Sequence, residues 1–534
     1  MFMSRLNEQA VSDLDRCIVQ TAQGKLRGIC KDGTFIFRGI KYADAERFEE
    51  PVPVQPWEGV IDAMWYEAIC PNITTPLPHD QILAPHAFGP QDENCQYLNI
   101  WTQALDNRAK RPVIVFIHGG AGSSVEQYCY DGEEMSKFGD VVMVTFNHRM
   151  NILGCLDFSE FGEKYVNSKS LSLADITAAL KWVRENIASF GGDPDNVTLE
   201  GQSFGNFKAI AVMQSPAADG LYHRVICSGD PSIYPKTVNG YEPAEVSRMT
   251  AKKMVEAAGG MEALKALSYE ELADVYLKAD SEVRAVTGGV GAPMSLIPSG
   301  KEGAYYIGHP LDVGFRRENL HIPMLVGTSF GEHYSNIEYD AEQGKRTNRF
   351  SMKSALSNEK VATCIRRIFG DDAKEAEDLF AELFPYRAGV DLLFMDRLSR
   401  YNWVELAKKR IIQGSAPVYS WVFDTDSLFL GGITAWHCSE IHYHFHNAQF
   451  NEASYIPGIT EKLQDEMAGA WCRFAEFGDP NPAAAAGQEA GTWTEWKPVT
   501  EKTCITMWFS GCAGRIYLTE GQDERLLELL RKHI

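Results

Sequence analysis

The sequence contains no uninterrupted run of about 18 apolar residues, the length that a helix needs to cross a bilayer. Its opening stretch, MFMSRLNEQAVSDLDRC, also has no apolar run of about 7 to 15 residues, the core of a secretory signal. These two absences predict a soluble protein that stays in the cytoplasm and has no membrane partner.

Cysteine is sparse and shows no pairing pattern. The 12 cysteines are scattered along 534 residues without any Cys-x-x-Cys spacing, so neither a zinc ribbon nor a dithiol redox motif is indicated. Most of them are expected to be small, buried, hydrophobic side chains. We expect no metal ion and no cofactor.

Positive charge is also scarce. Asp and Glu number 72 against 51 Lys and Arg, which gives a formal net charge of -21 at pH 7. Such a chain repels phosphate backbones, and this excludes nucleic acid as a general partner. Apolar residues make up 45% of the chain, which is typical of a packed globular core and not of a disordered protein.

What is present is an alternation of strand-like and helical patterns, which predicts an α/β protein with a central, mostly parallel sheet flanked by helices. The strand-like runs are PVIVFIHGG, VVMVTFNHR, VTLEGQS, HRVICSG, IPMLVG and PVYSWVF, and the last helix pattern is DERLLELLRKH. We expect one domain over residues 1–534, with helical insertions at about 240–290 and 340–410. A separate lid domain is the alternative for these insertions.

The helix that precedes VTLEGQS is predicted from a stripe of apolar residues at steps of three and four. Ser172 and Asp175 stand near its start and suit its N-terminal cap. We expect these two side chains to bind the first backbone N–H groups of the helix.

A serine stands between two glycines in the pentapeptide Gly201-Gln202-Ser203-Phe204-Gly205. The strand-like VTLEG precedes it and the helix-like FKAIAVMQ follows, which places Ser203 at the carboxyl end of a strand. In a Gly-x-Ser-x-Gly elbow the serine occupies a tight strand-to-helix turn, and the glycines avoid clashes with the backbone. We interpret Ser203 as a nucleophile, and the alternative is an ordinary serine in a glycine-rich loop.

The strand-like PVIVFI leads into a run of small residues, FIHGGAGSS, at residues 116–124. Small residues at a strand end expose backbone N–H groups, which in such hydrolases complete an oxyanion hole with the N–H that follows the nucleophile. The alternative is a plain glycine-rich turn or a phosphate cradle, although no Gly-Lys-Ser/Thr follows.

A base is expected late in the chain, because elbow-type triads run in the order Ser, acid, His. The segment ITAWHCSEIHYHFHN offers His437, His442, His444 and His446. Four histidines at this spacing are also a candidate metal site. The alternation HYHFH suits a strand or a surface turn, and we favour a base over a metal site.

An acid stands between the nucleophile and the base in the chain. Glu332 follows the strand-like HIPMLVG, and the carboxyl ends of strands are where open α/β sheets build their sites. The order Ser203, Glu332, His437 is the order of an elbow-type triad. The alternative for Glu332 is an ordinary loop carboxylate.

Assembled, these segments resemble the type-B carboxylesterase and cholinesterase family of the α/β-hydrolase fold over nearly the whole chain, closest in character to its soluble bacterial members. The family's Glu-Asp-Cys-Leu-x-Leu-Asn signature looks like ENCQYLN at residues 93–99. Further matches are TAQGKLRGI, FRGIKYA, ALKWVRENIASFGGDPDNVTLEGQSFG and WCRFAEFGDPN.

The resemblance implies a role for each matching residue. The residues that match the family's active site are Ser203 as the nucleophile, Glu332 as the acid, His437 as the base, Gly120, Ala121 and Phe204 as backbone oxyanion donors, and Ser228 and Gln202 beside the triad. The resemblance also implies structural ion pairs of Arg47 with Glu93 and of Arg149 with Asp175.

The chain departs from the family at the nucleophile and in the glycine run. Gln202 and Phe204 stand where the family usually has Glu and Ala, so a carboxylate is lost and a bulky ring follows Ser203. Phe204 keeps its N–H but is expected to narrow the acyl pocket. Ala121 replaces the third glycine of the family's His-Gly-Gly-Gly run, and it would distort the hole if that position has a positive φ.

Cys70 and Cys95 match the family's first disulfide. The resemblance therefore implies a possible bridge between them, and the alternative is two free thiols in a reducing cytoplasm. The segment between them has no tryptophan, whereas cholinesterases have their choline-stacking residue there. Cholinesterase activity is therefore not expected, because the aromatic face for the cation is missing.

The resemblance implies a serine carboxylesterase that acts on small-molecule esters without a cofactor, and Phe204 predicts a preference for small acyl groups. An amidase or a hydrolase of a special natural ester is the alternative on the same triad. A non-catalytic adhesion or scaffold relative is a further alternative, which the presence of Ser203, Glu332 and His437 disfavours. A monomer and a homodimer are both compatible with the sequence.

Overall fold

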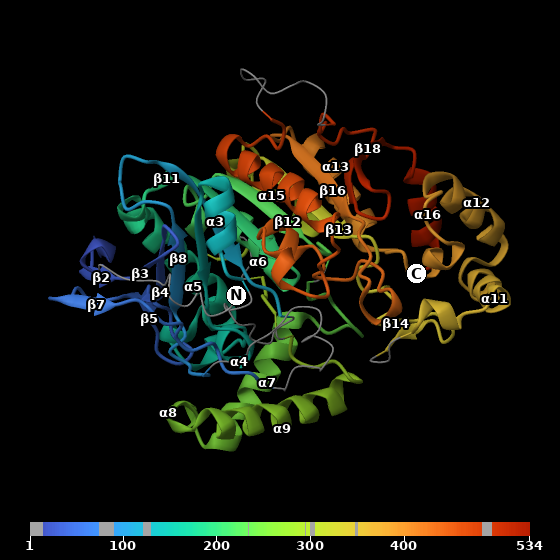
Figure 1. Ribbon diagram of the computed structural model, residues 1–534. Helices are drawn as coiled ribbons and strands as arrows, with labels where there is room; N and C mark the ends of the chain where they lie inside the picture. Colours follow the sequence, from blue (N-terminus) through green and yellow to red (C-terminus); the bar gives the residue numbers. More distant parts are fainter. Residues whose placement is uncertain are drawn as a thin grey trace. The chain divides into compact units, whose positions relative to one another are not determined.

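The structure of the protein is a computed structural model, which describes residues 14–73, 90–120, 130–232, 234–293, 295–298, 305–347, 351–482 and 494–534. The described residues group into two compact units. Those within 14–223 and 234–319 form the first unit, and those within 224–232 and 320–534 form the second. Each unit combines strands and helices (Figure 1).

The first unit contains strands in the order β11-β9-β10-β8-β4-β3. These strands are β3 (Ile29–Lys31), β4 (Thr34–Lys41), β8 (Tyr97–Thr102), β9 (Arg111–Ile117), β10 (Val142–Phe146) and β11 (Gly192–Gln202). β9 pairs in parallel with β10 and β11, whereas β8, β4 and β3 are joined by antiparallel pairing. The strands predicted from PVIVFI, VVMVTF and VTLEG are confirmed.

The central strands of this unit are buried on both faces. Every residue from Val113 to Ile117 in β9 is buried, and so is every residue of β10. Parallel strands that are covered on both faces read as continuous apolar runs. This is why PVIVFI and VVMVTF indicate strands without an alternating pattern.

Helices of the first unit cover this sheet and extend away from it. They are α3 (Glu133–Gly139), α4 (Asn151–Gly154), α5 (Leu171–Asn186), α6 (Phe204–Met213), α7 (Pro243–Ala258), α8 (Met261–Ala266), α9 (Tyr269–Thr287) and α10 (Pro310–Val313). α3 packs on β4, β8 and β10, while α5 and α6 pack on β11. α7 and α9 lie side by side (Figure 1).

The start of α5 differs from the prediction. Ser172 Oγ donates a hydrogen bond to the carbonyl oxygen of Arg149 at 2.5 Å, and Asp175 is completely buried in an ion pair with Arg149 at 2.7 Å. The predicted cap is wrong, because both polar side chains bind a residue outside the helix. The ion pair of Arg149 with Asp175 that the resemblance implies is confirmed.

The second unit contains strands in the order β18-β17-β16-β13-β12. They are β12 (Arg224–Ser228), β13 (Met324–Ser329), β16 (Val418–Phe423), β17 (Ile505–Ser510) and β18 (Arg515–Glu520). All pairings are parallel except that of β17 with β18. The strands predicted from HRVICSG, IPMLVG and PVYSWVF are confirmed.

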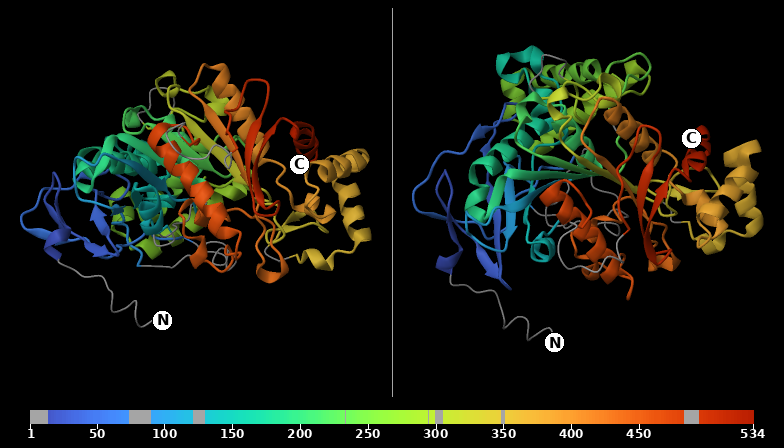
Figure 2. Two further views of the ribbon diagram at one scale, coloured as in Figure 1. Left: turned by 45° about the horizontal axis from the view of Figure 1, so that its top comes forward. Right: turned by 90° about the horizontal axis from the view of Figure 1, so that it is seen from above.

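Helices of the second unit are α11 (Asn358–Phe369), α12 (Ala373–Leu383), α13 (Ser399–Ile412), α14 (Ile441–His444), α15 (Thr460–Phe477) and α16 (Glu524–Lys532). α13 packs on β13 and β16, and α15 packs on β17. The red C-terminal helix α16, predicted from DERLLELLRKH, lies beside the gold helix α12 (Figure 2). Among the helices described in both units, none combines the length and the apolar character needed to cross a bilayer.

Short strands form smaller sheets in both units. In the first unit they are β1 (Ile18–Gln20), β2 (Lys25–Arg27) and β7 (Val60–Asp62) in one sheet, and β5 (Ala43–Asp44) with β6 (Val52–Pro53) in another. In the second unit β14 (Tyr339–Asp340) pairs with β15 (Lys345–Arg346). The β14–β15 hairpin follows the predicted acid, Glu332, closely in the chain.

Candidate active site

Ser203 lies on a sharp turn between β11 and α6. β11 ends at Gln202 and α6 begins at Phe204, so Ser203 alone joins the strand to the helix. Its backbone has φ 57° and ψ -126°, a strained conformation that residues with a side chain rarely adopt. The strained strand-to-helix turn predicted from the Gly-x-Ser-x-Gly motif is confirmed.

Close packing of the backbone explains the two glycines of the motif. A Cβ atom on Gly201 would overlap the carbonyl oxygen of Gly205, and a Cβ atom on Gly205 would overlap the carbonyl oxygen of Ile117. Ile117 is the last residue of β9. The first turn of α6 therefore packs directly on the end of β9, which only residues without a Cβ atom allow.

The glycine run that follows β9 packs against the same turn. A Cβ atom on Gly119 would lie 2.8 Å from Ser203 Cβ and 3.4 Å from the backbone nitrogen of Phe204. Gly120 has φ 100°, a value that glycine adopts readily and other residues rarely. The backbone just before Gly120 therefore lies against the N–H of Phe204. The third predicted oxyanion donor, Ala121, lies outside the described residues.

Both neighbours of Ser203 in the motif are buried. The ring of Phe204 contacts the ring of Phe207 edge-on at 5.5 Å between centroids, and Lys208 Nζ lies 5.2 Å from the Phe204 centroid. Gln202, which stands where the resemblance expects a glutamate, is the last residue of β11. The ring of Phe204 therefore packs along its own helix.

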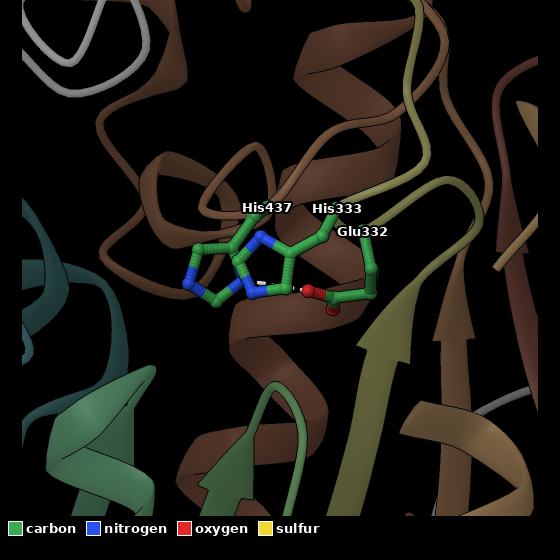
Figure 3. A group of neighbouring side chains, drawn as sticks. All are labelled: Glu332, His333 and His437. Atoms are coloured by element: carbon green, nitrogen blue, oxygen red, sulfur yellow. Dashed lines mark hydrogen bonds and ion pairs between the residues drawn. The ribbon is translucent and has the colours of Figure 1, made fainter. Parts of the chain in front are cut away.

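In the second unit, Glu332 and His437 form a buried pair (Figure 3). His437 Nδ1 lies 2.6 Å from Glu332 Oε2. Because a carboxylate only accepts hydrogen bonds, Nδ1 carries the proton and Nε2 is the basic nitrogen of the neutral ring. The structure thus brings together the two residues predicted as acid and base.

Two neighbouring segments hold this pair in place. Glu332 follows the end of β13 with φ 40°, and its Oε1 accepts the Ser329 N–H at 2.7 Å. The N–H of Gly331 donates to the carbonyl oxygen of Ala435 at 2.8 Å, and the N–H of His437 donates to that of Glu332 at 3.3 Å. The backbone therefore fixes the distance between the acid and the base.

A second buried carboxylate, Glu440, is linked to the pair through Ser329. Its Oε1 accepts a hydrogen bond from Ser228 Oγ, and its Oε2 accepts one from Ser329 Oγ at 2.9 Å. Ser228, predicted to lie beside the triad, thus connects to Glu332 through Glu440 and Ser329. Glu440 is absent from the predictions, although it stands only three residues after His437 in the histidine-rich segment.

Burial and neighbouring charges set the proton affinities of the pair. Burial lowers the pKa of His437 below its ordinary value, although the charges of Glu338 and Glu440 act to raise it. Burial, followed by the charge of Glu440, raises the pKa of Glu332 well above its ordinary value. The lowered pKa keeps the imidazole of His437 neutral near pH 7 and ready to accept a proton.

His333 lies beside the pair (Figure 3). Its ring centroid is 4.2 Å from that of His437, with a tilt of 38° between the rings. Its Nδ1 lies 3.0 Å from Glu338 Oε2, and a guanidinium nitrogen of Arg346 lies 2.8 Å from the same oxygen. This group of charges is a further feature that the sequence motifs do not reveal.

Glu332, His333 and His437 also each offer one ligand atom within 4.8 Å of the others. In the part of the chain that the structure describes, no other group of three His, Cys, Asp or Glu side chains could hold a metal ion. Glu332 and His437 already bind each other, and His333 binds Glu338. The arrangement therefore fits an acid–base pair better than a metal centre.

The other three histidines of the segment have different partners. His442 Nδ1 lies 3.0 Å from Asn447 Oδ1, and His446 Nε2 lies 2.6 Å from Asp465 Oδ1. The ring of His444 packs against Trp471, with 5.0 Å between centroids. His442, Tyr443 and His444 lie in the short helix α14, and Phe445 and His446 follow in a turn, so the predicted strand is wrong. Residues two apart on a helix point to different sides.

Cys70 and Cys95 are both buried free thiols in the structure. The disulfide that the resemblance offers is therefore not formed here. Burial, followed by a hydrogen bond with Cys70, raises the pKa of the Cys95 thiol well above its ordinary value. Nearby, Arg47 Nε lies 2.8 Å from Glu93 Oε2, which confirms the second ion pair that the resemblance implies.

The structure therefore places the predicted site residues in two groups. The first unit holds Ser203, Phe204, Gly120 and Gln202, and the second unit holds Glu332, His437 and Ser228. Within each group, the backbone contacts described above set the positions of the side chains.

The chain matches the model of the carboxylesterase family over residues 15–510. It is a member of this family. The chain is 30% identical over 504 residues to para-nitrobenzyl esterase from Bacillus subtilis (strain 168), which covers 91% of this chain and 94% of that protein. It is 28% identical to phenmedipham hydrolase from Pseudarthrobacter oxydans, over 88% of this chain and 91% of that protein.

Solved structures of carboxylesterases are also similar. One is an esterase from the anaerobe Clostridium hathewayi that can hydrolyse aliphatic aromatic polyesters, with a TM-score of 0.85, 38% identity, and coverage of 98% of this chain and 100% of that chain. Another is a carboxylesterase from Geobacillus stearothermophilus, with a TM-score of 0.67, 28% identity, and coverage of 96% and 100%.

As a member of the carboxylesterase family, the chain has the α/β-hydrolase fold and is a carboxylic ester hydrolase. The fold class and the enzyme class expected from the sequence are confirmed. Carboxylesterases act on small-molecule esters, and this agrees with the expected kind of substrate.

Proposed function

We propose that this carboxylesterase works through Ser203, His437 and Glu332. His437 removes the Ser203 proton as Ser203 Oγ bonds to the ester carbonyl carbon, and Glu332 holds the imidazolium that forms. The imidazolium then protonates the leaving alcohol, and water releases the acid from the acyl-enzyme. Backbone N–H groups of Gly120, Ala121 and Phe204 bind the oxyanion in both steps.

The observation that carries this proposal is the buried 2.6 Å contact of His437 Nδ1 with Glu332 Oε2, which leaves Nε2 as the basic nitrogen. The strained turn at Ser203 supports the nucleophile. The assignment of Ser203 and His437 to one site follows from the motifs that the chain shares with the family.

Replacement of the nucleophile tests the proposal. We expect Ser203→Ala to lower kcat for para-nitrophenyl acetate by roughly 10⁴-fold or more, because the hydroxyl that forms the acyl-enzyme is gone. Ser281→Ala, at an exposed serine on α9, serves as the matched control and should keep full activity. Equal turnover by wild type and Ser203→Ala would sink the proposal.

Chromogenic substrates also test the two alternatives, an amidase and a non-catalytic relative. Matched para-nitroanilides and para-nitrophenyl esters distinguish an amidase from an esterase, and we expect the ester to be cleaved faster. A non-catalytic relative would cleave neither. Full activity in the presence of a chelator is expected, because the metal-binding candidates in the described part of the chain have other partners: Glu332 and His437 bind each other, and His333 binds Glu338.

The acyl preference is proposed from Phe204. Its ring is buried beside the nucleophile, so we infer that it limits the room for the acyl chain. We expect acetate and propionate esters to be cleaved faster than hexanoate or branched esters, and Phe204→Ala to reduce this difference. Faster cleavage of long acyl chains by wild type would refute the inference. An aromatic diester belongs in the panel because of the similarity to the polyester-cleaving esterase.

We further propose that the two units belong to one hydrolase domain. The family model runs from residue 15 to residue 510 and so includes segments of both units. The helices α7 to α9 and α11 to α13 would then be insertions in that domain.

A further inference from the structure

Lys208 is the one charged residue of α6, and it is completely buried. α6 begins directly after the nucleophile, and all ten of its residues are buried. Lysine is almost never fully buried unless its charge is paired. Among the described residues, however, no carboxylate forms an ion pair with Lys208. Its neutral partners therefore indicate what the side chain does.

The Lys208 ammonium has three acceptors for its three N–H groups. Nζ lies 3.0 Å from the carbonyl oxygen of His118, 3.0 Å from His148 Nε2 and 3.7 Å from Met150 Sδ. His148 Nδ1 lies 3.0 Å from the carbonyl oxygen of Arg149, so Nδ1 donates and Nε2 accepts. The orientation of His148 is thus set by a backbone carbonyl, and His148 in turn orients Lys208.

His118 directly precedes the two glycines that pack against the nucleophile turn. The ring of His118 stacks on that of His148, with 4.9 Å between centroids and 16° between planes. His118 Nδ1 lies 3.1 Å from the carbonyl oxygen of Gly119, to which it donates. Lys208 and His148 therefore hold both the carbonyl group and the ring of His118.

These contacts act on the N–H of Gly120 through peptide planarity. The carbonyl of Gly119 and the N–H of Gly120 belong to one planar peptide unit, so fixing the oxygen also fixes the direction of the N–H. In the same way, the bond from Lys208 to the His118 carbonyl fixes the direction of the Gly119 N–H. A chain of contacts thus leads from Lys208 through His118 to the proposed oxyanion donor at Gly120.

We propose that Lys208, together with His148, is a positioning residue for the oxyanion hole, because it holds His118 and thereby the peptide unit that carries the Gly120 N–H. This inference rests on the proposed function, in which Gly120 is an oxyanion donor. Donors that are fixed before the reaction stabilise the charge that develops in the transition state without any reorganisation.

The protonation state of Lys208 is compatible with this role. Burial lowers the pKa of Lys208 to about 7, with Cys155 and Cys70 acting to raise it. Burial, followed by the charges of Lys208 and His118, lowers the pKa of His148 well below its ordinary value. A neutral amine keeps two N–H donors, which are enough for the His118 carbonyl and His148. We expect the positioning to persist on both sides of neutral pH.

Lys208→Met is the direct test, because methionine has a similar length but no N–H donor and no charge. We expect kcat for para-nitrophenyl acetate to fall by about tenfold or more while KM changes by less than about threefold, since the oxyanion exists only in the transition state. The affinity for a trifluoromethyl ketone, whose serine adduct carries an oxyanion, should fall by a similar factor. Lys181→Met, at an exposed lysine on α5, is the matched control and should change neither quantity.

A second pair of variants and a measurement without turnover complete the test. His148→Gln keeps an acceptor for Lys208 and His148→Leu removes it, so we expect the glutamine variant to retain more of kcat. Hydrogen exchange at the peptide that contains Gly119 and Gly120 should be faster in Lys208→Met than in wild type and Lys181→Met.

The outcomes separate this inference from the proposed function. A folded Lys208→Met with wild-type kcat and wild-type exchange overturns the inference. If Lys208→Met fails to fold, equal and wild-type kcat values for His148→Gln and His148→Leu overturn it. If wild type cleaves no ester, the proposed function fails, and unchanged exchange in Lys208→Met would still overturn the positioning role.

Discussion

At the scale of single residues, the protonation of His437, the proposed general base, is expected to set the acid limb of the pH–activity profile. Four charged groups act on its pKa: Glu338, Glu440 and Asp230 raise it, and Arg346 lowers it. Burial has the largest effect and lowers the pKa. A general base must be neutral, so activity falls when the pH drops below its pKa. The plateau of kcat/KM should therefore extend below about pH 6.5, the ordinary pKa of histidine.

Neutralising Glu338 should move the acid limb of kcat/KM to still lower pH. Burial alone would raise the pKa of Glu338, but the hydrogen bond from His333 and nearby positive charges hold it at about 2, so it is ionised wherever the enzyme works. Glu338→Gln removes a negative charge that favours the imidazolium. We expect the acid limb of kcat/KM to move to lower pH by a few tenths of a unit to about one unit. A pH series on para-nitrophenyl acetate measures the shift.

Two further variants serve as controls for this experiment. Arg346→Gln should move the acid limb to higher pH, since Arg346 lowers the pKa of His437. Glu342→Gln, at an exposed glutamate that pairs with Lys360, should leave it unchanged. An acid limb that moves upward in Glu338→Gln would contradict the assigned role of this carboxylate.

Sequence patterns reveal some of these residues and not others. Ser203 stands out because the Gly-x-Ser-x-Gly pattern is contiguous in the chain, although Gly205 is required by the carbonyl oxygen of the distant Ile117. Lys208 leaves a weaker signal, a single charge within the apolar helix FKAIAVMQ. The partners of Lys208 and of Glu440 cannot be seen in the sequence, because each binds residues that are distant in the chain.

At the scale of elements, the site depends on the contact between the end of β9 and the first turn of α6. The glycine run after β9 and the glycines around Ser203 remove Cβ atoms from both sides of this contact. The strained φ of Ser203 is tolerated because the surrounding packing fixes the turn. The close approach of two backbones is therefore the structural basis of the sharp turn at Ser203.

Adding one methyl group at this contact should strongly reduce both stability and activity. In Gly205→Ala the new Cβ atom would overlap the carbonyl oxygen of Ile117, so α6 must move away from β9. We expect the free energy of unfolding to fall by about 3 kcal/mol or more, together with most of the activity. Urea unfolding and para-nitrophenyl acetate turnover measure the two effects.

A matched glycine supplies the control. A Cβ atom on Gly389 would meet no atom within 4 Å, so Gly389→Ala should change the free energy of unfolding by less than about 1 kcal/mol. Wild-type stability and turnover in Gly205→Ala would show that the contact can relax without consequence.

Predictions of helices and strands succeeded where a sequence pattern fits one structure, and they failed where the same pattern fits two. Continuous apolar runs indicated β9 and β10, because strands buried on both faces need no polar side. The alternation HYHFH suggested a strand, yet its first three residues lie in α14, where His444 packs on Trp471. Ser172 and Asp175 have the types of capping residues, but a buried arginine uses both.

At the scale of the whole molecule, two of the proposed site residues lie just after strands that pair in parallel. Ser203 follows β11, Glu332 follows β13, and both β11 and β13 take part in parallel pairing. The carboxyl ends of parallel strands are where α/β proteins place their functional residues. The family match extends over residues 15–510, so the motifs that predict the site belong to one continuous pattern.

The sequence by itself determined the strands, the strand-to-helix turn at Ser203 and the family, and it predicted the order of nucleophile, acid and base. These features can be predicted because they appear as short contiguous patterns of apolar residues and glycines. Only the tertiary structure decided that Ser329 links Glu440 to Glu332 and that Lys208 holds His118. The physical reason is burial: a polar group removed from water must find a partner, and the fold supplies that partner from a distant part of the chain.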